Sequence, residues 1–313
     1  MDFLLKELKK YGRVKANALL SRHATFRIGG PAKYLVAVEV REKLVELLDF
    51  LSGEGHSFFI LGGGSNLLLP DDGFDGVVVK ISLKELSVTD QVVMAEAGAW
   101  LGQVLDLAVK NSLTGLEWAA GIPGTIGGAV RGNAGAMGQD ISKNIQKVEV
   151  WQDGEIKELS REECGFIYRG SDFKNDPQAV ILRVWLALAK GEVRQILATV
   201  QENLKQREGK FPPYPSAGCF FKNVKLDKWP GHPKDLPTIF LERGTVPAGW
   251  LIDQAGARGL LQGGAAVSDK HCNFVINKDK ASQADVLAVV EEVRTRVYNK
   301  FKVELELEVE IIK

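Results

Sequence analysis

The sequence predicts an α/β protein, and three observations support this prediction. The chain has 313 residues, enough for two or three modest domains with cores of their own. Apolar residues make up 45% of it and charged residues 26%, which is ordinary for a soluble globular protein. Segments rich in β-branched and aromatic residues alternate with segments of helical periodicity through the first two-thirds of the chain.

The order of the elements follows from these patterns. A short amphipathic helix at the start is expected to turn Phe3, Leu4 and Leu8 inward. Strands are predicted at 34–38, 57–61, 76–81, 92–96, 147–151 and 179–188. Apolar residues at helical spacing predict helices around 44–51 and 101–108, and a third helix whose inward residues are Val193, Ile196, Leu197, Val200 and Leu204.

The last third of the chain begins at a proline-rich connection. Three prolines between 212 and 215 remove backbone donors and restrict the residues before them, so this stretch is a plausible domain boundary. Ser282 and Asp285 form a capping-box pattern ahead of a helix with valines on one face. Strict alternation of apolar and acidic residues then predicts a strand over 301–313.

Composition excludes several classes of function. Forty acidic and forty basic side chains cancel, so the chain has no electrostatic footprint for nucleic acid. No apolar run is long enough to span a bilayer. Three distant cysteines fit a reducing compartment, and four scattered histidines give no metal-ligand spacing. We therefore expect a cytoplasmic protein with no metal and with neither nucleic acid nor membrane as a partner. We also expect a monomer, although composition does not determine the oligomeric state.

Two glycine-rich stretches point to a phosphate-bearing cofactor. Gly62–Asn66 is one, and six glycines between 121 and 135 make the other. Neither is a Rossmann fingerprint, since the first leads into a poor helix start and no strand immediately precedes the second. No Gly-Lys-Ser/Thr follows, which removes the Walker loop. Taken singly, each stretch is equally consistent with a tight turn.

Taken together, the segments resemble the family of UDP-N-acetylmuramate dehydrogenases, also called UDP-N-acetylenolpyruvoylglucosamine reductases. The family's ordered motifs cover most of the chain. They are SRHATFRIGGPAKYLV (21–36), LGGGSNLL (61–68), GLEWAAGIPGTIGGAVRGNAGA (115–136), FIYRGSDFK (166–174), PSAGCFFKN (215–223), AGWLIDQAGARGLLQGGAAVSDKHCNFVIN (248–277) and the closing VELELEVEII. The absence of a long insertion after YRGSDFK resembles the shorter of the two family subtypes.

The resemblance implies a two-lobed FAD-binding domain of the vanillyl-alcohol-oxidase (PCMH) type, followed by a C-terminal α+β substrate domain. We place these domains at 1–195, with the lobes split near residue 85, and at 196–313. By the same resemblance, the residues expected to bind FAD are Gly62, Gly63, Gly64, Ser65, Asn66, Leu67, Pro123, Gly124, Thr125, Gly127, Gly128, Asn133, Val180 and Arg207.

The implied reaction uses NADPH and FAD to reduce UDP-N-acetylglucosamine enolpyruvate to UDP-N-acetylmuramate, a step of peptidoglycan precursor synthesis. Hydride addition develops charge on the substrate carboxylate, so the site needs a cation and an acid. Three positions match the family's catalytic residues: Arg169, Cys219 and Glu308. Arg169 and Glu308 would stabilise the enolate, Cys219 would protonate it, and Asn223 would bind the substrate.

Two of these assignments leave alternatives open. The family most often has serine where this chain has Cys219; a free thiol titrates near 8.5 and can donate a proton, but free cysteines are also commonly buried apolar residues. Periodicity alone cannot choose among the four glutamates of 304–310, and Glu306 is the alternative to Glu308. Two rival functions also remain: another flavin oxidase on the same scaffold, and a nucleotide-sugar binder without catalysis.

Overall fold

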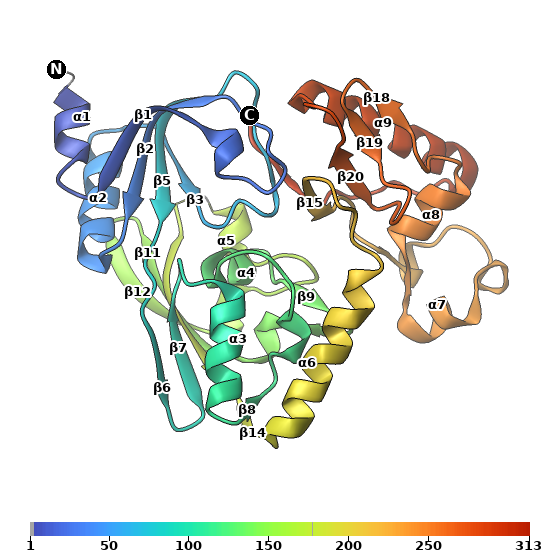
Figure 1. Ribbon diagram of the computed structural model, residues 1–313, viewed down its shortest axis with the longest axis horizontal. Coiled ribbons are helices and arrows are strands. Elements are labelled where there is room, and N and C mark those ends of the chain that lie inside the picture. Colours follow the sequence, from blue (N-terminus) through green and yellow to red (C-terminus); the bar gives the residue numbers. More distant parts are fainter. Residues whose placement is uncertain (1–2, 177) are drawn as a thin grey trace. The chain divides into compact units, whose positions relative to one another are not determined.

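The computed structural model describes residues 3–176 and 178–313 (Figure 1). Its contacts divide the chain into two compact units. Unit 1 consists of the chain up to Ala18, Ala32–Gly63 and Phe74–Glu208. Unit 2 consists of Leu19–Pro31, Gly64–Gly73 and Gly209–Lys313. The predicted boundary between residues 195 and 196 lies inside helix α6 (Val193–Glu208), and all of α6 belongs to unit 1.

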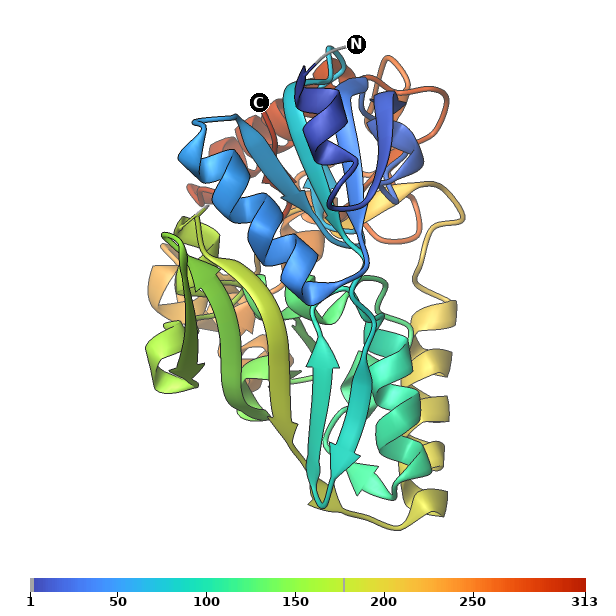
Figure 2. The ribbon, with the colours of Figure 1, turned by 90° about the vertical axis from the view of Figure 1, so that its left-hand side faces the viewer.

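The first sheet of unit 1 has the strand order β1-β2-β5-β3. Its members are β1 (Arg13–Leu19), β2 (Pro31–Val38), β5 (Phe74–Ile81) and β3 (Phe58–Leu61), and the last three are parallel. Helix α2 (Arg41–Gly53) crosses one face of this sheet (Figure 2) and buries the leucines that recur at helical spacing. Helix α1 (Phe3–Leu8) precedes β1.

The second sheet of unit 1 is antiparallel, in the order β12-β11-β13-β7-β6. Its members are β12 (Glu155–Ser160), β11 (Ile145–Gln152), β13 (Val180–Ala187), β7 (Val92–Glu96) and β6 (Leu86–Thr89). The helices of this part are α3 (Leu101–Lys110), α4 (Ile126–Arg131), α5 (Asp172–Asn175) and α6. Two-residue strands complete it: β8 (Leu113–Thr114) with β14 (Ala189–Lys190), and β9 (Gly135–Ala136) with β10 (Gln139–Asp140).

Unit 2 is built on a four-stranded sheet in the order β15-β20-β19-β18. Its members are β15 (Ser216–Cys219), β20 (Phe274–Asn277), β19 (Ala265–Val267) and β18 (Leu261–Gln262). Helix α9 (Gln283–Phe301) packs on this sheet, and α7 (Thr238–Arg243) and α8 (Ala248–Gln254) lie in the preceding connection. Two short pairs complete the unit: β16 (Val224–Lys225) with β17 (Thr245–Val246), and β21 (Glu310–Ile311) with β4 (Leu67–Leu68).

Most predicted elements are confirmed to within a residue or two, and the capping box of α9 is the clearest case. The Ser282 hydroxyl accepts the Asp285 N–H at 3.0 Å, and the Asp285 carboxylate accepts the Ser282 N–H at 3.0 Å. The reciprocal bonds satisfy two donors that a helix start leaves unpaired. The valines of the predicted inward face are all buried.

Two expectations about packing are wrong. Phe3 of α1 is 70% exposed, whereas Leu8 is buried as expected. In α6 the buried stripe runs through Ile196 and Asn203 rather than through Val193, Leu197 and Leu204, which are exposed. The stripe is therefore rotated by about one residue around the helix from the predicted face.

The predicted terminal strand is also broken into two pieces. Lys222 N–H donates to the Glu306 carbonyl and Glu308 N–H donates to the Phe220 carbonyl, whereas Ile312 N–H donates to the Leu68 carbonyl. One stretch of alternating residues thus pairs with two different segments. The change of partner falls at residues 308 to 310.

Candidate flavin site and active site

The two glycine-rich stretches meet within unit 1. A Cβ on Gly63 would lie 2.8 Å from the Gly124 Cα, and a Cβ on Gly62 would lie 2.7 Å from the Thr125 Oγ1. Gly124 also has φ +129°, which a residue with a side chain rarely adopts. Only glycine allows these backbones to approach so closely, so the contact between the two loops depends on glycine at these positions.

Helix α4 begins inside the second glycine stretch and uses part of it for packing. Thr125 is its N-cap, and its hydroxyl accepts the Gly128 N–H at 3.5 Å. Gly127 donates its N–H to the Ala97 carbonyl at 3.0 Å, and a Cβ there would lie 2.8 Å from the Ala97 Cβ. Gly127 is thus needed for close packing, and its contact with a cofactor stays a prediction.

Two further predicted cofactor residues belong to unit 1. Arg207, on α6, donates from Nη2 to the Trp118 carbonyl at 3.1 Å, and its Cδ would lie 3.4 Å from a Cβ on Gly121. The structure therefore brings Arg207 to the first residue of the second glycine stretch. Val180 is buried at the start of β13, where it pairs with Trp151 of β11.

The second half of the first stretch, Gly64–Leu67, belongs to unit 2. Gly64 has φ +65°, and a Cβ there would overlap the His23 carbonyl. Asn66 donates from Nδ2 to the Glu308 carbonyl at 3.1 Å, and its own carbonyl accepts the Glu310 N–H at 3.0 Å. These predicted cofactor residues are therefore joined to the terminal segment.

The glycine contact in unit 1 sets peptide groups of the two loops side by side, and the facing loop occupies the space that a Cβ would need. Peptide groups in this arrangement can bind phosphate oxygens, and binding of FAD phosphates here stays a prediction. The residues that would hold FAD there are Gly62, Gly63, Pro123, Gly124 and Thr125. Among the described residues, no group of histidine, cysteine and carboxylate side chains could hold a metal ion.

Arg169 lies in a tight turn of unit 1. Ile167 and Gly170 exchange backbone hydrogen bonds of 3.0 and 3.1 Å, so Tyr168 and Arg169 are the two central residues. Arg169 has φ +58°, in the left-handed region. Its Nη2 donates to the Gly135 carbonyl at 2.7 Å, and its guanidinium carbon lies 5.2 Å from the Tyr168 ring centre.

Asn133 holds the backbone of this turn. It is 4% exposed, its Nδ2 donates to the Ile167 carbonyl at 2.9 Å, and its Oδ1 accepts the Ser142 N–H at 3.3 Å. Nearby, the Ser171 hydroxyl donates to the Arg131 carbonyl at 2.7 Å. The end of the second glycine stretch is thus bonded to the turn that carries Arg169, a connection that spacing in the sequence does not reveal.

The segments that carry Cys219 and Glu308 pair with each other in unit 2. Cys219 ends β15, and the carbonyl of the next residue, Phe220, accepts the Glu308 N–H at 2.9 Å. Phe221 and Leu307 form an antiparallel bridge beside this bond. Phe220, the residue after the predicted proton donor, is therefore the backbone partner of Glu308, while Arg169 belongs to unit 1.

The structure separates Glu308 from two other glutamates of its segment. Glu304 and Glu306 are exposed, whereas Glu308 and Glu310 are half-buried. Glu306 pairs with Lys228 at 2.7 Å and with Lys222 at 3.7 Å, and the hydrogen bond from Lys228 lowers the pKa of the Glu306 carboxyl. Exposed pairs of this kind are ordinary surface features, so Glu308 is better placed than Glu306.

Cys219 also differs from the other two cysteines. Cys164 and Cys272 are buried, and burial raises the pKa of the first to about 12 and of the second to about 11. Cys219 is half-buried. A proton donor must be reachable by its acceptor, and of the three thiols Cys219 is the one that meets this condition.

Two asparagines near Cys219 were missed from the sequence. Asn273 is buried, accepts the Phe221 N–H at 3.0 Å and donates to the Phe221 carbonyl at 2.8 Å. Asn277 is buried and donates to the Phe26 carbonyl at 3.2 Å. Both asparagines lie in the family motif at 248–277, and only that motif could have marked them in the sequence.

The predicted substrate residue Asn223 is bonded within unit 2. Its Oδ1 accepts the Ala248 N–H at 3.1 Å, so a substrate contact would use its amide nitrogen.

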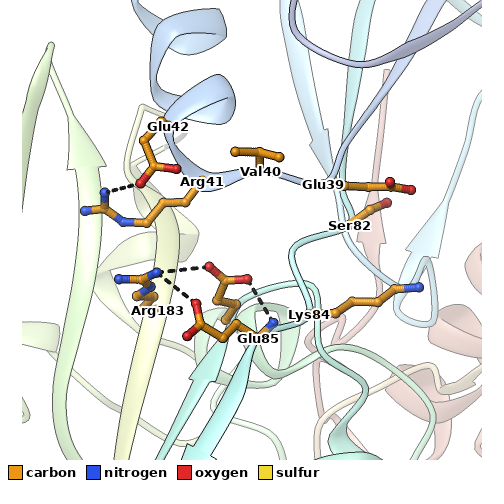
Figure 3. Close-up of a pocket in the computed structure, with 9 residues that line it drawn as sticks. Glu39, Val40, Arg41, Glu42, Ser82, Lys84, Glu85 and Arg183 are labelled. Carbon is orange, nitrogen blue, oxygen red and sulfur yellow. Dashed lines mark hydrogen bonds and ion pairs between the residues drawn. The ribbon is translucent and has the colours of Figure 1, made fainter.

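A charged cavity of unit 1 lies apart from these predicted residues. It has a volume of about 530 Å³, and Arg41, Lys84, Arg183 and four glutamates are among the residues that line it (Figure 3). Arg183 pairs with Glu85 at 3.2 Å and with Glu96 at 3.3 Å. A hydrogen bond from Arg41 to Glu149 raises the pKa of Arg41. The arginines that line this cavity pair with carboxylates of the protein, and none of the predicted site residues lines the cavity.

Known proteins share these motifs over the whole chain. A family model for an FAD binding domain matches residues 32–160, and one for the C-terminal domain of UDP-N-acetylenolpyruvoylglucosamine reductase matches 210–312. UDP-N-acetylenolpyruvoylglucosamine reductase of Caldanaerobacter subterraneus is 40% identical over 98% of this chain and 96% of its own. The Carboxydothermus hydrogenoformans enzyme of the same name is 38% identical, over 96% of this chain and 94% of its own.

A solved structure agrees with these relatives. The crystal structure of the Thermus caldophilus UDP-N-acetylenolpyruvylglucosamine reductase is 34% identical with a TM-score of 0.77, and the match covers 96% of this chain and 99% of that one. The fold is therefore a PCMH-type FAD-binding domain with a C-terminal domain of this reductase type. The chain belongs to the UDP-N-acetylenolpyruvoylglucosamine reductase family.

Proposed function

We propose that this chain reduces UDP-N-acetylglucosamine enolpyruvate to UDP-N-acetylmuramate in peptidoglycan precursor synthesis, with FAD as cofactor and NADPH as reductant. The observation that carries the proposal is the backbone pairing that joins the segment of Glu308 to Phe220 and Phe221, the two residues that follow Cys219. A rival flavin oxidase would need the glycine cradle, but it would have no use for an acid and a carboxylate at this pairing. Bound FAD would accept a hydride from NADPH and deliver it to the enolpyruvyl double bond.

The remaining chemistry falls to side chains of this protein. Arg169 would bind the substrate carboxylate and stabilise the enolate, because a guanidinium stays charged and offers parallel donors. Its bond to the Gly135 carbonyl holds the guanidinium in place before substrate arrives. Glu308 would assist at the enolate, and the Cys219 thiol would donate the proton that completes the product. Asn223 would bind the substrate through its amide nitrogen.

We also propose that residues 1–195 form the FAD-binding part and 196–313 the substrate part. Arg207 would reach the FAD phosphates from α6, as its contact with Gly121 supports. Among the described residues, no helix is long and apolar enough to cross a membrane. We further propose a cytoplasmic monomer whose partners are these small molecules, without nucleic acid or membrane.

Product analysis tests the function. Purified protein with FAD, NADPH and UDP-N-acetylglucosamine enolpyruvate should form UDP-N-acetylmuramate, detected by mass spectrometry, with one NADPH consumed for each product. Protein that binds FAD and oxidises NADPH without forming this product would be another oxidoreductase. Protein that neither binds FAD nor forms product would contradict the cofactor assignment as well.

A further inference from the structure

Asn133 stands at the junction between the second glycine stretch and the turn that carries Arg169. It is the second residue after α4, it has φ +42°, and it is 4% exposed. Asparagine tolerates this left-handed conformation better than most residues. Both ends of its amide bond to protein backbone: one to Ser142 and one to Ile167.

The bond to Ile167 bears directly on the Arg169 turn. The Ile167 carbonyl accepts two hydrogen bonds, from Gly170 N–H at 3.1 Å and from the Asn133 Nδ2 at 2.9 Å. A carbonyl oxygen has two lone pairs, so this oxygen is fully used. The Gly170 bond closes the turn, and the Asn133 bond attaches the turn to the rest of unit 1.

The guanidinium is tied to the same loop. Arg169 donates from Nη2 to the Gly135 carbonyl, two residues after Asn133. The backbone and the side-chain end of Arg169 are thus both fixed by residues 133 to 135. A shift of this loop would move both, and a shift of about 1 Å in a catalytic group can cost about 10²-fold in rate.

We propose that Asn133 is a positioning residue that holds Arg169 in its productive conformation, rather than a residue that binds FAD directly. The proposal rests on the catalytic role of Arg169 proposed above. Asn133 follows α4, which begins next to the contact between the two glycine stretches. Asn133 therefore also connects that contact to Arg169. Loss of the Asn133 amide should therefore loosen the turn while the glycine contact itself remains.

The test compares Asn133→Ala with Asn203→Ala, a matched control. Asn203 is a second buried asparagine of unit 1, and its Nδ2 donates to the Glu117 carbonyl at 2.8 Å. Hydrogen–deuterium exchange of the FAD-free proteins should be faster across residues 167–171 in Asn133→Ala and unchanged there in Asn203→Ala. Anaerobic reoxidation of the NADPH-reduced, FAD-saturated protein by substrate should slow by about 10–100-fold in Asn133→Ala only.

A double-mutant comparison separates positioning from a direct role. If Asn133 acts through Arg169, the variant Asn133→Ala/Arg169→Ala should reoxidise no more slowly than Arg169→Ala alone. FAD affinity of Asn133→Ala should stay within about threefold of the parent, since the glycine contact remains intact. If Asn133→Ala does not fold, Asn133→Asp keeps the acceptor for Ser142 and replaces the donor to Ile167 with an acceptor oxygen.

Three results would overturn the inference: unchanged exchange at 167–171, multiplied effects in the double variant, or a loss of FAD affinity with unchanged reoxidation at saturation. If Arg169→Ala itself leaves reoxidation unchanged, the proposed catalytic role fails instead. The exchange comparison still decides whether Asn133 holds the turn.

Discussion

Arg169 and Glu308 are held in place by different means. The turn of Arg169 is attached to its unit by side chains, chiefly the amide of Asn133 and the hydroxyl of Ser171. The segment of Glu308 is held by backbone hydrogen bonds on both sides, to Phe220 and to Asn66. A backbone pairing survives most substitutions, whereas an attachment through side chains depends on residue identity.

Arg169 and Glu308 are nevertheless each bonded to one of the two glycine stretches. Asn133, near the end of the second stretch, bonds beside Arg169, and Asn66, at the end of the first, bonds to the Glu308 carbonyl. Both asparagines were expected to contact FAD. The comparison suggests that such residues shape the active site as much as they bind the cofactor, and substitutions can separate these roles.

The largest effect is expected at Arg169. Arg169→Ala removes a preorganised charge, so substrate-driven reoxidation of the flavin should slow by about 10³-fold. Reduction of the flavin by NADPH should stay close to the parent rate. Anaerobic stopped-flow absorbance at the flavin band measures both steps, and equal slowing of both would contradict a role confined to the substrate.

A smaller loss is expected at Glu308. Glu308→Gln should slow reoxidation by about 10²-fold, because one group that acts at the enolate is lost while the backbone pairing stays. Glu306→Gln is the matched control, since its exposed pairs with Lys228 and Lys222 contribute little. A larger effect at Glu306 than at Glu308 would reverse the assignment.

Asn66→Ala should have a modest effect. It removes one side-chain hydrogen bond, worth about 1 kcal/mol of stability. The carbonyl of residue 66 still accepts the Glu310 N–H, and Glu308 N–H still donates to Phe220. Urea unfolding and single-turnover reoxidation check this; a loss in rate as large as that of Glu308→Gln would show that backbone pairing does not suffice.

The smallest effect concerns Cys164. Burial raises the pKa of its thiol to about 12, so the folded protein keeps a proton that the unfolded chain releases above pH about 9. The free energy of unfolding should therefore fall as the pH rises from about 9 towards 12. Cys164→Ala should flatten this fall in urea unfolding series, and an identical slope in both proteins would contradict a buried, protonated thiol.

Thiol labelling extends the comparison to the three cysteines. Iodoacetamide at pH 8 should modify half-buried Cys219 before Cys164 and Cys272, whose raised pKa values and burial suppress the thiolate. Peptide mass spectrometry identifies the site. First modification at either buried cysteine would show that Cys219 is less accessible than its position indicates.

Local patterns predicted most of the fold. The valine stripe and capping box of α9 and the leucine stripe of α2 agree with the structure because their periodicity is also their packing. The break in the terminal segment could not be predicted, because alternation continues through it while the pairing partner changes. Helix α4 was not predicted, because Gly127 and Gly128 have low helix propensity.

The sequence likewise predicted some residues of the candidate site but not the contacts between them. Motif order indicated Arg169, Cys219 and Glu308, but four equivalent glutamates gave no local reason to prefer one. Half-burial distinguishes Glu308 from the exposed Glu304 and Glu306, and Glu306 is also engaged in surface ion pairs. The bonds from Asn133 and Asn66 join residues far apart in the sequence, so only the folded chain shows them.

The most direct test of the proposed chemistry is single-turnover reoxidation in Cys219→Ala. The parent and the variant are reduced anaerobically with NADPH and then mixed with UDP-N-acetylglucosamine enolpyruvate. Reduction by NADPH should be unchanged in the variant, and reoxidation and product formation should slow by about 10²–10⁴-fold, the usual contribution of a positioned acid. Reoxidation and product formation at the parent rate would contradict it, because another group would then supply the proton.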